Sequence, residues 1–199
     1  MRKTAKRALD RLSSEEQSTI LKALLAKHPD LRNEAEGLAQ ELLAPPVSEH
    51  VADDVEAALA APGIDALNAR TGSGQWGYVE PGDAAAEILS EAIEDVVQDM
   101  VRRMSLGLEG AGVALRVGTV LGLRRADQGA KDGVLGWDPD FPKEHASTVV
   151  LELLKACPED RRAGVRDLVL REIEDAAPEW CWTIARATEP KARRRSRPG

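Results

Sequence analysis

The chain has 199 residues, 43% of them hydrophobic and 31% charged, a balance that is ordinary for a globular protein and excludes disorder throughout. The net charge of −7 is unevenly placed, because residues 1–7 carry +4 and residues 190–199 carry +5, which leaves −16 between them. An acidic body repels phosphate, so nucleic acid is an unlikely main partner.

Only six side chains are aromatic, so the core must be built from aliphatic residues, which favours helices over a β-sandwich or barrel. We predict an all-α fold of antiparallel helical hairpins, forming a bundle or a short α-solenoid, with two loops rich in Gly, Asp and Pro. The expected divisions are an N-terminal helical hairpin module, a short helix with a Gly-rich loop, a main helical bundle and a basic disordered tail, at residues 1–62, 63–82, 83–189 and 190–199.

The first predicted hairpin follows the basic N-terminus. Ser13 and Glu16 have capping-box spacing, and Pro29 ends the helix that they open. A second helix is expected from about residue 30 to residue 43. Apolar residues recur at helical spacing along both segments: Ile20, Leu21, Leu24 and Leu25, then Leu31, Ala35, Leu38 and Leu42.

Residues 12–44 read LSSEEQSTILKALLAKHPDLRNEAEGLAQELLA. This stretch resembles the helical-hairpin units of HEAT-like proteins and the uncharacterised bacterial helical regions found beside SWIM zinc fingers. The cysteine and histidine ligands of a SWIM finger are absent from it. The resemblance implies an interaction scaffold and brings no catalytic residues with it.

A third helix is expected up to Pro62, and a segment without helical pattern, TGSGQWGYVEPG, occupies residues 71–82. Its glycines match the letters of the dinucleotide-binding fingerprint. That motif requires a strand before it and a helix directly after it, whereas here no apolar strand precedes and Pro81 intervenes. We interpret the segment as a flexible or partner-contacting loop.

The central predicted hairpin comprises a helix over 83–106, with Asp83 as N-cap and Gly107 as a left-handed C′ residue, and a helix over 109–126. The second helix carries one row of small residues, Gly110, Ala114, Gly118 and Gly122. Each helical glycine costs about 1 kcal/mol relative to alanine, so the row predicts a closely packed neighbour. The neighbour is either another helix of the same chain or a second copy in a homodimer.

Acidic residues repeat at every fourth position of the first central helix: Glu87, Glu91, Asp95 and Asp99. The row is either a solvated helix face or a docking strip for a basic partner. The chain's own Arg193, Arg194 and Arg195 are candidates for that partner.

Up-and-down helices would bring the loops at 71–82 and 127–142 and the start of a last helix at Pro178 to one end. The helices between them are expected at 143–156 and 159–175, which separates Cys157 from Cys181. Candidate interaction residues therefore gather at that end: Trp76, Tyr78, Trp137, Asp138, Asp140, Phe141, His145, Trp180 and Trp182. They form either an aromatic plug or a partner or ligand site.

No metal-ligand motif, phosphate loop or nucleophile elbow is present in the sequence, so we expect no catalytic residue, metal or cofactor. No apolar segment follows the basic start, which indicates the cytoplasm, and Glu109 and Arg116 interrupt the stretch that would have to span a membrane.

Three functional hypotheses follow, and the first is a non-catalytic scaffold with a protein partner. The second is a small-ligand binder or enzyme that uses the aromatic loop end through Trp76, Trp137, Asp138, Asp140 and His145. The third is a nucleic-acid accessory protein that acts through the basic termini.

Overall fold

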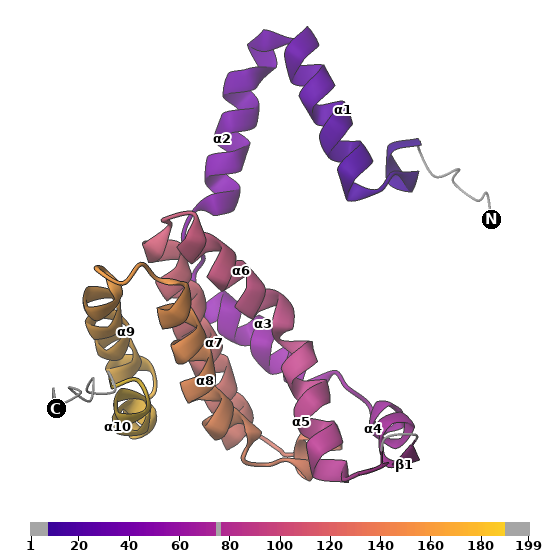
Figure 1. Cartoon of the computed structure of the whole chain (residues 1–199), viewed down its shortest axis with the longest axis vertical. Coiled ribbons are helices and arrows are strands. Elements are labelled where there is room, and N and C mark those ends of the chain that lie inside the picture. Colours follow the sequence, from indigo (N-terminus) through magenta and orange to yellow (C-terminus); the bar gives the residue numbers. More distant parts are fainter. Residues whose placement is uncertain (1–7, 75–76, 190–199) are drawn as a thin grey trace, which may run out of the picture. The chain divides into compact units, whose positions relative to one another are not determined.

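The structure, a computed structural model, describes residues 8–74 and 77–189, so Trp76 and the basic tail with its arginines lie outside the described residues. The described residues form ten α-helices, three 3₁₀ helices and one two-stranded β-hairpin, and the fold is all-α as predicted (Figure 1). The chain divides into two compact units, residues 1–44 and residues 45–199.

The N-terminal unit consists of two α-helices joined by a single 3₁₀ turn, in the order η1 Ala8–Arg11, α1 Ser14–Lys27, η2 Pro29–Leu31 and α2 Arg32–Leu43. The predicted capping box is confirmed, because the Ser13 backbone N–H donates to Glu16 Oε2 over 2.8 Å and the Glu16 N–H donates to Ser13 Oγ over 3.3 Å. Both helices pack against the η2 turn that joins them.

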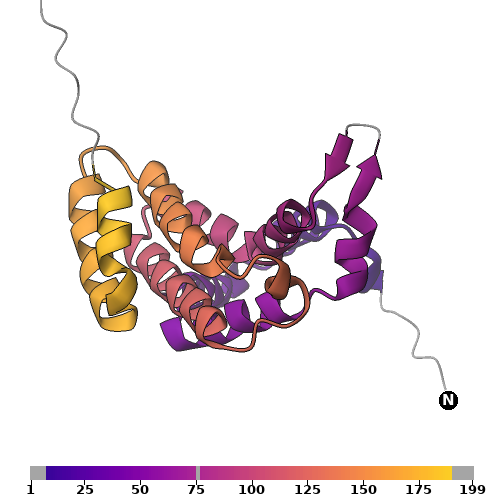
Figure 2. The same cartoon turned by 90° about the horizontal axis from the view of Figure 1, so that it is seen from below.

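The larger unit contains the remaining elements, which are α3 Ser48–Ala60, α4 Ile64–Arg70, β1 Gly72–Gly74, β2 Gly77–Val79, α5 Pro81–Ala92, α6 Glu94–Ser105, α7 Glu109–Gln128, η3 Gly133–Trp137, α8 Phe141–Ala156, α9 Arg162–Ala176 and α10 Pro178–Ala187. The central helix is α7, which packs against α3, α6, α8 and α9 (Figure 2). Since α3 packs along α7, it belongs to this unit, and the boundary expected after residue 62 lies after residue 44.

The row of small residues on α7 faces α3 of the same chain. A Cβ placed on Gly118 would lie 2.5 Å from Val51 Cβ, and one placed on Gly122 would lie 2.7 Å from the Ala52 carbonyl oxygen. Ser48 Oγ also donates to the Ala114 carbonyl oxygen over 3.2 Å. The prediction of close packing is confirmed. At Gly118 and Gly122 the close neighbour is α3 of the same chain.

The helix predicted over 83–106 is two helices. It begins at Pro81 with Glu80 as N-cap instead of Asp83, and it breaks at Ile93, where φ is −110° and ψ is 5°. Its end is as predicted, because Gly107 has φ +76° and the Leu108 N–H bonds to the Arg103 carbonyl oxygen over 2.9 Å.

The two predicted loops contain short ordered elements. The loop at 71–82 includes the antiparallel pair of β1 and β2, in which Ser73 is paired with Tyr78, so the dinucleotide-like glycines belong to a β-hairpin. The loop at 127–142 is shortened, because α7 continues to Gln128, η3 follows and α8 begins at Phe141. A Cβ placed on Gly82, at the end of the first loop, would lie 3.7 Å from the carbonyl oxygen of Trp137 in the second loop. The two loops therefore lie side by side.

Ion pairs and hydrogen bonds fix the direction of the later helices. The start of α9 meets the start of α7 through Arg161 Nε and Glu109 Oε1, 2.8 Å apart. The end of α9 meets the end of α7, where Arg124 Nη1 donates to the Ala176 carbonyl oxygen over 3.0 Å and Arg124 Nε pairs with Glu179 at 2.5 Å. The helices α7 and α9 are therefore parallel, and the start of α10 returns to the loop end of α7.

Candidate functional site

The predicted aromatic end does not form a packed cluster in the described part of the chain. Tyr78, Trp137 and Trp182 are largely exposed, and the last of these has Arg186 over its ring at 5.4 Å. Trp180 is buried in the core, and Phe141 is buried against His145, with ring centroids 4.6 Å apart. A plug would bury Tyr78, Trp137 and Trp182, whereas these three side chains are exposed.

The polar groups predicted for that end have different surroundings. Burial and the charges of Glu144 and Asp140 raise the pKa of Asp138, against a hydrogen bond from the Phe141 backbone. Burial and the charge of Arg116 lower the pKa of His145. Among the predicted residues of the described part, Phe141 therefore contacts both His145, through ring stacking, and Asp138, through its backbone N–H.

The sequence pattern did not predict that Arg116 is a fully buried charged residue. It is 0% exposed in the middle of α7, where Nη2 lies 3.1 Å from the Met100 sulfur and neither Nε nor Nη1 has a hydrogen-bond partner. Burial lowers the pKa of Arg116 to about 9, which the charge of Glu152 opposes, so the guanidinium is still charged at neutral pH. An open groove between α6 and α8 is lined by Glu94, Gln98, Glu152 and Lys155 among others, and Arg116 is not one of its lining residues.

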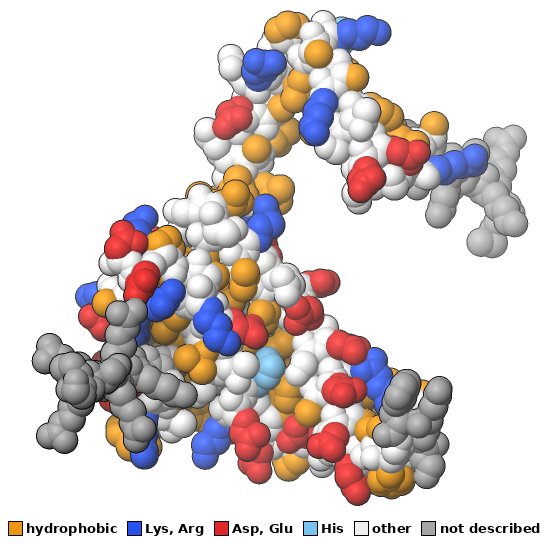
Figure 3. All heavy atoms as spheres, in the orientation of Figure 1, with side chains coloured by type: hydrophobic (Ala, Val, Ile, Leu, Met, Phe, Trp, Pro, Cys, Tyr) orange, Lys and Arg blue, Asp and Glu red, His pale blue; other side chains and the backbone are white. Residues whose placement is uncertain are grey.

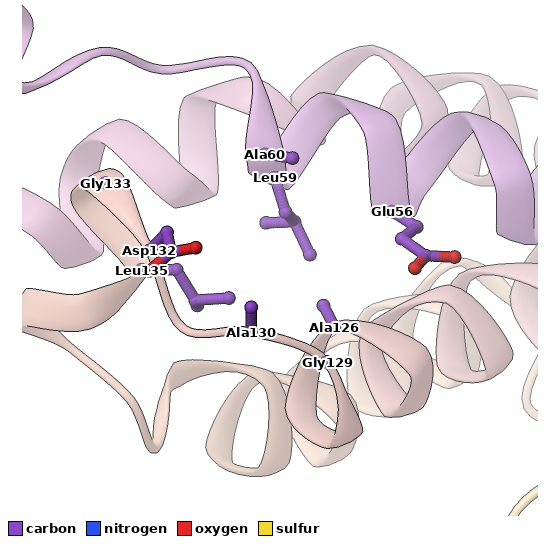
Figure 4. Close-up of a pocket in the computed structure, with 9 residues that line it drawn as sticks. All are labelled: Glu56, Leu59, Ala60, Ala126, Gly129, Ala130, Asp132, Gly133 and Leu135. Carbon is purple, nitrogen blue, oxygen red and sulfur yellow. The ribbon is translucent and has the colours of Figure 1, made fainter.

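A pocket of about 320 Å³ lies between α3 and the segment after α7 (Figure 4). Its walls are mainly aliphatic, with Leu59 and Leu135 projecting into it, and its charged groups are the carboxylates of Glu56 and Asp132. None of the predicted aromatic residues lines it. The pocket therefore does not supply the aromatic ligand site that the sequence suggested.

The acidic row is not a continuous strip. The break at Ile93 leaves Glu87 and Glu91 on α5 and Asp95 and Asp99 on α6. Both oxygens of Glu91 accept from Arg70, over 2.8 and 2.6 Å. Asp99 accepts from its helix neighbours Arg102 and Arg103, over 2.9 and 2.8 Å.

The surface that stands out is that of α1 and α2 in the N-terminal unit. No residue of α1 or α2 is buried, although both helices carry the apolar rows expected from the sequence. Leu21 is 51% exposed, Leu38 61% and Leu42 72%. Figure 3 shows apolar side chains open at the surface of both helices. We call the apolar residues Ile20, Leu21, Leu24, Leu38 and Leu42 the hairpin face.

Such exposure is unusual for helices of this length. Isolated helices of fewer than about 12–15 residues are marginal in water, and packing of an apolar face supplies most of their stability in proteins. The buried residues of the described chain run from Val51 to Thr188, all within the larger unit. Packing of the hairpin face would therefore stabilise α1 and α2.

Among the described residues, no group of three or more His, Cys, Asp and Glu side chains is placed to hold a metal ion. Cys157 and Cys181 are both free thiols, and burial raises the pKa of each. No helix in the described ranges combines the length and the apolar character that crossing a membrane requires. Comparisons with protein-family models, with curated proteins and with solved structures find no match to this chain.

Proposed function

We propose that this protein is a non-catalytic helical interaction protein of the cytoplasm that docks on a protein partner through the hairpin face. The observation that carries the proposal is the full set of exposed leucines on two helices that have no buried residue. Large exposed apolar patches mark interaction sites on folded proteins. Two free cysteines agree with a reducing compartment.

The energetics of the hairpin face support a protein partner. Fully burying a leucine or isoleucine side chain stabilises by about 1.5–3 kcal/mol, and the five residues of the face are 43–72% exposed. Covering them therefore contributes on the order of 5 kcal/mol of favourable binding free energy, from which the entropic cost of association must be subtracted. A small ligand in a concave pocket would not cover a face that extends over two helices.

Photo-crosslinking in cells that produce the protein naturally tests the proposal. A photoreactive amino acid in place of Leu21 or Leu38 should form crosslinks to another polypeptide chain. The control position is Leu106, a leucine of the larger unit that is 56% exposed, against 51% for Leu21. Crosslinks confined to residues 45–189 of the same chain, or a yield no higher than at Leu106, would contradict the proposal.

A further inference from the structure

We propose that the partner of the hairpin face is the same face on a second copy of the chain, so that two α1–α2 hairpins form an antiparallel four-helix bundle. This inference rests on the proposed function and names its partner. Two copies of α1 and α2 supply four amphipathic helices, the number that encloses a core in a four-helix bundle.

The size of the hairpin face suits such a dimer. Burying one CH₂ group stabilises by about 0.8 kcal/mol, and burying apolar surface stabilises by about 25 cal/mol per Å². One CH₂ group therefore has about 32 Å² of surface, and a four-carbon side chain has about 130 Å². With five such side chains 43–72% exposed, each copy offers about 350 Å² of apolar surface. Two copies then bury about 700 Å² of apolar area, and an interface that is about 60% apolar totals about 1,200 Å². That is the lower end of the range for stable interfaces.

The charges on α1 favour antiparallel pairing. Glu16 and Lys27 are eleven residues, or three helical turns, apart, so they lie on the same edge of the apolar row. When two α1 helices pair antiparallel with Leu21 at the two-fold axis, Glu16 of one copy lies within about 1.5 Å of axial alignment with Lys27 of the other. The symmetry repeats the pair. Parallel pairing would instead align Glu16 with Glu16 and Lys27 with Lys27.

Sedimentation equilibrium of the intact chain at tens of micromolar tests the pairing. The wild-type protein should be a dimer, and Leu21→Glu or Leu38→Glu should be monomers whose larger unit unfolds at an unchanged temperature. Leu106→Glu, an equally exposed leucine outside the hairpin, should remain a dimer. A monomeric wild-type protein, or a dimer that survives both hairpin variants, would overturn the inference.

A charge exchange tests the antiparallel register. Glu16→Lys and Lys27→Glu should each weaken self-association by about fivefold or more at low salt, since each creates two like-charge contacts. Mixed together, the two variants should form a heterodimer with affinity restored, because every contact is then between opposite charges. Glu16→Lys also removes a capping bond, so recovery in the mixture is the decisive measurement. Equal affinity of the mixture and of the separate variants would overturn the register.

The photo-crosslinking experiment separates failure of this inference from failure of the proposed function. Crosslinks from Leu21 to α1 of a second copy support the dimer. Crosslinks to a different protein overturn the dimer and leave docking through the hairpin face intact. Crosslinks confined to residues 45–189 of the same chain overturn both.

Discussion

A guanidinium inside an apolar interior raises the free energy of the folded state unless hydrogen bonds replace its hydration. Arg116 has no exposed surface and keeps two unpartnered nitrogens, Nε and Nη1. Arg103, on the neighbouring helix, shows the usual solution, because it is nearly as buried but pairs with Asp99 at 2.8 Å. The two arginines therefore have opposite expected effects on stability.

Replacing Arg116 by methionine should raise the free energy of unfolding by about 1–2 kcal/mol, because an apolar side chain of similar length removes the uncompensated charge. Arg103→Met is the matched control and should lower stability, since it breaks an ion pair. Urea unfolding at pH 7 measures both. Destabilisation by Arg116→Met would show that the guanidinium is bound in solution, by water or by a ligand that enters between α6 and α8.

At the scale of elements, the contact of α3 with α7 depends on the absence of side chains at two positions of α7. A Cβ on Gly118 would lie 2.6 Å from the Ser48 carbonyl oxygen, which is backbone and cannot rotate away. The ion pairs of Arg125 with Glu49 and Asp53 lie beside this contact and depend on the same close approach. The helix α3 belongs to the larger unit for this reason.

Gly118→Ala should therefore destabilise the protein by about 1–3 kcal/mol, because the overpacked contact outweighs the helix propensity gained. Gly164 in α9 is the matched control, since nothing lies within 4 Å of a Cβ placed there. Gly164→Ala should raise stability by up to about 1 kcal/mol. Denaturant midpoints of the two variants give the comparison, and a Gly118→Ala protein as stable as wild type would disprove the close contact.

At the scale of the whole molecule, the two units differ in kind. Residues 45–199 contain every buried residue of the described part of the chain, whereas α1 and α2 contain none. The larger unit therefore has a buried apolar core, whereas the apolar residues of the smaller unit are exposed or half-buried.

Deletion of residues 1–44 should leave the melting temperature within about 4 °C of that of the intact protein, since a change of 1 kcal/mol corresponds to about 2–4 °C at this size. The isolated 1–44 peptide should be weakly helical at low concentration, because its helices have 14 and 12 residues. Circular dichroism measures both. Loss of cooperative unfolding on deletion would show that the hairpin contributes to the core.

Local sequence determined the helices and several of their ends. The capping box at Ser13 and the left-handed Gly107 were predictable because each depends on residues within one turn of the helix end. The small row on α7 predicted a close neighbour for an equally local reason, the cost of glycine in a helix. None of these signals says which element the neighbour is.

Tertiary structure alone decided the remaining features. The break at Ile93 has no glycine or proline to mark it, and it lies where α5, which packs on α4 and η3, gives way to α6, which packs on α7 and α8. Burial of Arg116 depends on α6, which contributes Met100, and on α8, which contributes Glu152 and His145. The apolar rows of α1 and α2 have the same helical period as the buried rows of the core. Periodicity shows that one face of a helix is apolar, but it does not show which element or molecule packs against that face.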